Sequence, residues 1–167
     1  VDDPDPGDTH SLSLSNSEDA PDFESFEIVG DELRTRGPFD FEARQEYTIR
    51  VQAVDPGSLT TSSLFTVYVQ DVNEAPVGML IDNCTVPENA AEDALIGTIV
   101  VMDPDLSDSH TLELFTDEEG PDSAAFQLIG HELHAAQSFN HEERSTYMIG
   151  IRAIDAGGLN FEDYLLV

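Results

Sequence analysis

The sequence predicts an all-β protein built of tandem Greek-key β-sandwiches. Apolar and polar residues alternate at strand spacing along almost the whole chain, and no stretch keeps a helical period. Turn residues recur at roughly ten-residue intervals, which is the pattern of a sandwich of about seven short strands. Hydrophobic residues make up 40% of the chain, which supplies enough apolar surface for a core and argues against disorder.

The chain also repeats itself after 100 residues. Residues 1–67 align with residues 101–167 without a gap, and 25 of these 67 positions are identical. Unrelated sequences of average composition would match at roughly one position in sixteen. The alignment predicts a nearly complete repeat over residues 77–167 and, over residues 1–76, a repeat that lacks its first strands.

Seven strands are expected in the second repeat, each as an apolar or alternating run. They cover residues 79–86, 95–102, 111–115, 126–129, 133–136, 147–154 and 159–167. Gly130 and His131 lie between the fourth and fifth runs and are typical of a tight hairpin. The number and spacing of these runs indicate an immunoglobulin-like sandwich for each complete repeat.

Charge narrows the classes of partner. The chain carries 35 acidic and 6 basic residues, a net charge of −29, which would repel nucleic acid and anionic membranes. A solvated acidic surface and a set of carboxylates that hold cations both remain possible. The single cysteine, Cys84, excludes an internal disulfide framework, and no apolar run could span a bilayer. Because the chain begins with Val1, we expect it to be a piece of a longer protein.

Acidic residues gather where strands end. The segment Asp71–Pro76 joins the two repeats, Asp103 and Asp105 follow the second strand of the second repeat, and Asp155 follows its sixth strand. In a sandwich these loops share one pole, so their carboxylates should converge. Calcium takes six to eight oxygen ligands from such groups, and a bound cation would relieve their mutual repulsion.

These motifs, in this order, resemble those of cadherin repeats over essentially the whole chain. They match the family's Asp-x-Glu element, its linker motif, its Asp-x-Asp element and its Ala-x-Asp-x-Gly element. The resemblance implies an interdomain calcium site formed by Asp40, Glu42, Asp71, Asn73, Glu74, Asp103, Asp105 and Asp155.

The resemblance also implies two partial calcium sites at the outer ends of the repeats. Glu88, in a Pro-Glu-Asn motif, belongs with Asn140 and Glu142 in a lower half-site of the second repeat. Asp3, Asp5 and Asp55 form the upper half-site of the first repeat. Asn140 stands where the first repeat has Asp40, so the lower site should carry less charge and bind calcium more weakly.

By the same resemblance, the chain is expected to be a calcium-binding adhesion module on the cell surface, part of a larger membrane-anchored or secreted protein. Its partner would be the same or a related cadherin-like protein, and adhesion would be homophilic. The absence of tryptophan excludes the tryptophan-anchored strand exchange of classical cadherins. A structural stalk or a carbohydrate-binding module of a large secreted or microbial surface protein is the alternative.

Several other groups invite a functional interpretation and are set aside. His131 and His134 could suggest zinc, but residues three apart on a strand face opposite sides, so both are predicted to be exposed strand positions. His10 and His110 are expected to shape the Asp-x-Asp loops. Paired carboxylates also occur in glycosidases, but here a metal would bind them, so we expect no enzyme. An acidic run is predicted to be a solvated loop; it comprises Glu118, Glu119 and Asp122.

Overall fold

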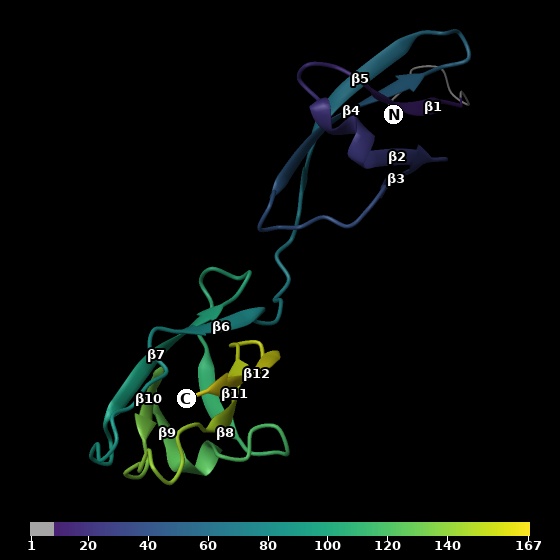
Figure 1. The fold of residues 1–167 in the computed structure, drawn as a ribbon. Coiled ribbons are helices and arrows are strands. Elements are labelled where there is room, and N and C mark those ends of the chain that lie inside the picture. Colours follow the sequence, from purple (N-terminus) through teal and green to yellow (C-terminus); the bar gives the residue numbers. More distant parts are fainter. Residues whose placement is uncertain (1–8) are drawn as a thin grey trace. The chain divides into compact units, whose positions relative to one another are not determined.

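The structure, a computed structural model, describes residues 9–167. Strands account for all of its regular structure apart from two short 3₁₀ helices, Pro21–Ser25 and Ser123–Ala125. The chain divides into two units at Val72 and Asn73 (Figure 1). Within the described part, no helix is long and apolar enough to cross a membrane. The predicted all-β class is confirmed.

The second unit contains seven strands in two antiparallel sheets (Figure 1). The first sheet has the order β6 (Gly78–Ile81), β7 (Leu95–Met102), β10 (Glu132–Ala135), β9 (Phe126–Ile129). The second has the order β12 (Asn160–Leu166), β11 (Met148–Ile154), β8 (Thr111–Phe115). These are the seven strands that the sequence predicts, and all bounds agree within one residue except the end of β6.

β6 ends at Ile81, five residues before the predicted end, because side-chain hydrogen bonds to β7 follow it in place of a regular backbone ladder. The Asp82 carboxylate accepts a hydrogen bond from the Thr98 backbone N–H at 2.7 Å. The Asn83 side-chain amide donates to the Ile96 carbonyl oxygen at 2.6 Å. The Asp82 backbone N–H still donates to the Thr98 carbonyl at 3.2 Å, and beyond it the side-chain bonds replace the ladder.

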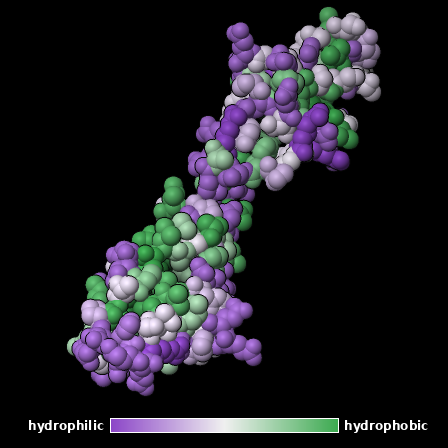
Figure 2. Space-filling model, in the orientation of Figure 1, coloured by the Kyte–Doolittle hydropathy of each residue, from purple (hydrophilic) through white to green (hydrophobic). Residues whose placement is uncertain are grey.

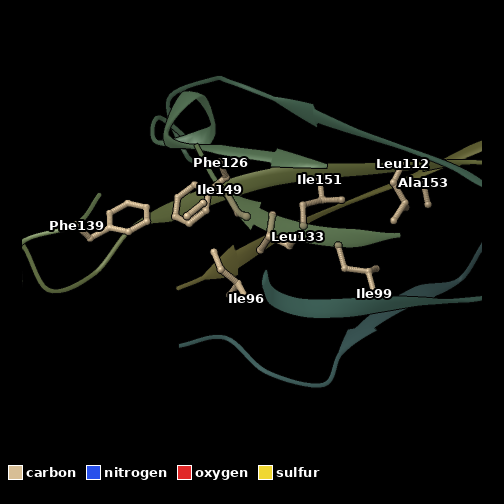
Figure 3. Close-up of a cluster of buried hydrophobic side chains, with 10 residues drawn as sticks. Ile96, Ile99, Leu112, Phe126, Leu133, Phe139, Ile149, Ile151 and Ala153 are labelled. Carbon is tan, nitrogen blue, oxygen red and sulfur yellow. The ribbon is translucent and has the colours of Figure 1, made fainter. Parts of the chain in front are cut away.

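The core of the second unit lies between its two sheets (Figure 3). Ile96 and Ile99 of β7 and Leu133 of β10 line one sheet, and they face Ile149 and Ile151 of β11 in the other. Leu133 and Ile149 are fully buried, at 0% exposure. Alternate residues of β11 point to this layer, as the alternation in the sequence predicts, whereas Ile96 and Ile99 are three apart and Ile96 lies at a register shift in the pairing of β7 with β10.

The first unit has a three-stranded sheet and a separate hairpin. The sheet has the order β1 (Ser11–Ser15), β4 (Glu46–Val54), β5 (Thr60–Tyr68), and the hairpin joins β2 (Phe26–Val29) to β3 (Glu32–Thr35). β10 pairs with both β9 and β7, whereas β3, its counterpart in the repeat, pairs only with β2 in the described part of the chain. Leu33 is consequently 43% exposed, while Leu133 is 0% exposed. Glu32 and Arg34 of β3 form an exposed ion pair at 2.7 Å.

An exposed apolar strip lies on the outer face of β6 and β7. Leu80 and Val100 are cross-strand neighbours and are 61% and 59% exposed. Figure 2 shows hydrophobic residues gathered over this region of the second unit. The strip is uncharged in an otherwise strongly acidic chain.

Asp122 is not part of a solvated loop, and that prediction is wrong for this residue. Its carboxylate binds the Arg144 guanidinium through both oxygens and accepts the Met148 backbone N–H at 2.8 Å. Arg144 also stacks on the Tyr147 ring, 4.5 Å from its centroid. The first unit repeats this arrangement with the corresponding residues, Asp22, Arg44, Tyr47 and Thr48. The ion pair of Asp122 with Arg144 is therefore structural. Together with the bond to the Met148 N–H, it ties the segment before β9 to β11.

His134 is buried, which corrects the prediction of an exposed strand position. Its Nδ1 lies 2.8 Å from the Asp93 carbonyl oxygen and its Nε2 lies 3.1 Å from a Glu132 carboxylate oxygen. Both partners are acceptors, so the doubly protonated ring can donate to both. The Asp93 carbonyl first, and then the Glu132 carboxylate, raise the pKa of His134.

This raised pKa predicts a pH dependence of stability. Because the folded pKa lies above that of the unfolded chain, the contribution of His134 is fully present below about pH 6.5 and is lost as the pH rises through the folded pKa. Unfolding by urea at pH 5.5 and 8.5 measures it. The loss of stability in His134→Gln should be larger at pH 5.5, and an equal loss at both values would contradict the assignment.

Candidate metal centre

Three segments of the second unit meet at one end of its sandwich, where strands β7 and β11 end and the chain enters β6. The Glu74 backbone N–H donates to Asp105 Oδ2 at 2.9 Å, and oxygens of the two carboxylates lie within 4.8 Å of each other. Asp103 Oδ1 accepts the Asp105 backbone N–H at 2.9 Å. The segment before β6 and the loop after β7 thus share a set of carboxylates.

The loop after β11 joins the same end through Asp155. The Asn73 side-chain amide donates to Asp155 Oδ2 at 2.9 Å. Gly157 makes this approach possible, because a Cβ there would lie 2.6 Å from the Asn73 side chain. The Ala156 backbone N–H also lies 3.3 Å from Asp108 Oδ2, which links this loop to the one after β7. The second unit therefore brings together the five predicted ligands that it carries, namely Asn73, Glu74, Asp103, Asp105 and Asp155.

Asp155 is held in its charged form although it is buried at 6% exposure. Burial by itself would raise the pKa of its carboxyl. Hydrogen bonds from Asn73 and from the Leu159 and Gly158 backbone N–H groups outweigh burial and lower the pKa. A buried carboxylate that stays ionised suits a cation site.

The first unit carries the other three residues of the predicted interdomain set. Glu42 and Asp71 bring carboxylate oxygens within 4.8 Å of each other. Asp40 Oδ1 accepts the Ala43 backbone N–H at 2.9 Å and so orders the loop that presents Glu42. Asp55, from the predicted upper half-site, caps its own turn by accepting the Leu59 N–H at 2.7 Å. Asp3 and Asp5 lie outside the described residues.

The predicted lower half-site lies at the opposite end of the second unit. The Asn89 backbone N–H donates to the Phe139 carbonyl at 2.9 Å, which ties the segment of Glu88 to the loop that carries Asn140. Asn140 Oδ1 accepts the Glu142 N–H at 3.1 Å. Glu88 lines a cavity of about 400 Å³ next to this loop. The two segments are adjacent, as the prediction requires.

Two residues that were not among the predicted ligands also lie at this end of the second unit, where β7 and β11 end. Asp108 and His110 place ligand atoms within 4.8 Å of each other and of Asp103. Both recur in the repeat as Asp8 and His10, and this recurrence was the signal for them in the sequence. His110 was predicted to shape this loop, and its hydrogen bond to Asp103 agrees with that role.

The donor set is chemically suited to calcium. All five candidate ligands of the second unit offer oxygen atoms, four of them from carboxylates, and hard oxygen ligands are those that calcium takes. Carboxylates this close repel one another unless a cation lies between them. The residues present therefore fit a bound calcium ion.

Comparison with known proteins identifies relatives of the chain. No protein-family model matches it. Human protocadherin beta-1 is 32% identical over 130 residues, which cover 75% of this chain and 16% of that protein. Chimpanzee protocadherin gamma-C4 is 30% identical over 173 residues, which cover 94% of this chain and 18% of that protein. The chain thus spans less than a fifth of the length of either relative.

Solved structures show the same fold. The protocadherin gamma-B4 extracellular domain superposes with a TM-score of 0.60 at 25% identity, covering 94% of this chain and 26% of that one. Extracellular cadherin domains 3–6 of protocadherin gamma-B2 give a TM-score of 0.66 at 19% identity, covering 94% of this chain and 39% of that one. Together with the sequence relatives, they establish that this chain belongs to the cadherin repeat family.

Proposed function

We propose that the chain is a calcium-binding adhesion module, part of a larger protein on the outside of the cell. Its relatives are protocadherins, members of a family of adhesion proteins. We take residues 1–76 as a repeat without its first strands and residues 77–167 as a nearly complete one. The observation that carries the proposal is the meeting of Asn73, Asp105 and Asp155 from three separate loops of the second unit.

The proposed calcium site spans the two units. Asp40, Glu42 and Asp71 of the first unit would complete the ligands that Asn73, Glu74, Asp103, Asp105 and Asp155 supply. When bound, calcium would neutralise these carboxylates and hold the repeats as a stiff rod. The rod would present an adhesive surface to a partner of the same or a related kind. The lower half-site would bind calcium more weakly because Asn140 carries no charge.

Thermal unfolding with calcium and with excess chelator tests this proposal. A ligand that binds only the folded state at a hundred times its dissociation constant adds about 2.7 kcal/mol of stability. For a unit of this size we expect millimolar calcium to raise Tm by roughly 10 °C or more. The shift should be lost in Asp103→Ala. An equal Tm with calcium and with chelator would contradict the calcium site.

Sedimentation velocity tests the adhesive part. We expect the wild-type chain to self-associate with increasing concentration in calcium and to be monomeric in chelator. Asp103→Ala should remain monomeric under both conditions. A calcium-stabilised chain that stays monomeric at all concentrations would leave the calcium site intact and contradict self-association by this segment.

A further inference from the structure

The imidazole of His110 is bonded directly to one of the proposed ligands. Its Nε2 lies 2.7 Å from Asp103 Oδ2, and both side chains are almost completely buried, at 10% and 3% exposure. The other oxygen of Asp103, Oδ1, accepts the Asp105 backbone N–H. A carboxylate only accepts hydrogen bonds at neutral pH, so Nε2 is the donor. Both oxygens of Asp103 are therefore held in place.

His110 is itself anchored to the frame of the sandwich. It directly precedes β8, which pairs with β11. Its carbonyl oxygen lies 3.1 Å from Nε2 of His131, and His131 is bonded to Ile99 of β7 through the backbone at 2.8 Å. The backbone of His110 is thus fixed by both sheets, and its ring bonds to Asp103 from that fixed position.

The first repeat has the same aspartate and histidine at the matching positions, but it lacks the second histidine. Asp3 and His10 stand where Asp103 and His110 stand, 100 residues apart. His131, by contrast, corresponds to Asp31. The histidine therefore recurs together with the acidic loop, and the second histidine that supports it does not.

We propose that His110 is a positioning residue for the calcium site, holding the Asp103 carboxylate in the orientation that binds the ion. This inference rests on the proposed function. Calcium prefers oxygen to imidazole nitrogen, and Nε2 is already directed at Asp103 rather than at an open coordination position. Hydrogen-bonded partners of metal ligands orient them and commonly contribute 10–100-fold in metal affinity.

Calcium titration calorimetry on the full chain tests the proposal, with Tm in excess chelator as a separate measure of folding. We expect His110→Ala to weaken calcium binding roughly 10–100-fold. His110→Gln, whose amide can still donate, should recover part of that affinity. The matched control is His134→Gln, a buried histidine in β10: it should lower Tm in chelator and leave calcium affinity unchanged.

A double-mutant comparison locates the effect. In an Asp103→Asn background, His110→Ala should change the remaining calcium affinity little, because its partner is already lost. Wild-type affinity in His110→Ala, or an equal loss in His134→Gln, would overturn the positioning role while the calcium site stands. A wild-type chain that binds no calcium would overturn both. Tighter binding of zinc than of calcium, lost in His110→Ala, would make His110 a ligand and also overturn the proposal.

Discussion

Asp122→Ala is expected to lower the free energy of unfolding of the second unit by about 3 kcal/mol, or Tm by roughly 15 °C. The variant loses two charge-assisted hydrogen bonds to Arg144 and leaves the Met148 N–H without its acceptor. Breaking a fully buried ion pair costs about 3–5 kcal/mol. Arg144 is 49% exposed and can be hydrated in the variant, which places the loss at the lower end.

Differential scanning calorimetry in chelator measures this loss, and the chain supplies its own controls. Glu162→Ala removes the exposed ion pair with Arg152 and should change stability by less than about 1 kcal/mol. Asp22→Ala breaks the matching pair in the first unit and should shift the transition of that unit instead. If Asp122→Ala behaves like Glu162→Ala, the ion pair is not a structural tie.

Leu133→Ala should destabilise the second unit by about 2–5 kcal/mol, because it removes buried methyl groups and leaves a cavity between the sheets. Leu133 is 0% exposed and lies among Ile96, Ile99 and Ile149. The rigid β-sandwich around it can close the cavity only in part, so the loss should fall well inside this range.

Leu33→Ala is the matched control, because Leu33 occupies the same position of the repeat and is 43% exposed. Its loss should be under about 1 kcal/mol, since much of the side chain already contacts water. Urea unfolding of both variants provides the comparison. Similar losses at Leu33 and Leu133 would show that the open face of the first unit is covered in solution.

The strands could be predicted because their signal is local. Alternation places Ile149, Ile151 and Ala153 on one face of β11, and the structure buries all three. Gly130 marks the hairpin turn and has a φ of +62°. The early end of β6 could not be predicted, because it depends on Asp82 and on its bond to a strand 16 residues away.

The candidate site was predicted through motifs, and its misjudged neighbours depend on distant partners. Asp122 meets Arg144 22 residues later, and His134 meets Asp93 across 41 residues. Asp122 was predicted to be exposed because it belongs to an acidic run, and His134 because residues three apart on a strand face opposite sides. The recurrence of Asp22 with Arg44 and of Asp122 with Arg144 was a signal in the repeat that could have revealed the ion pair.

The edge of β3 has a consequence for solubility. A strand whose outer backbone groups lack a ladder partner can template the addition of another chain, which is a common route to aggregation. β3 is only four residues long and carries Glu32 and Arg34, whose charges disfavour stacking of a second strand against it. Within residues 9–167, Glu32 and Arg34 therefore protect the edge of β3 against the addition of a strand from another chain.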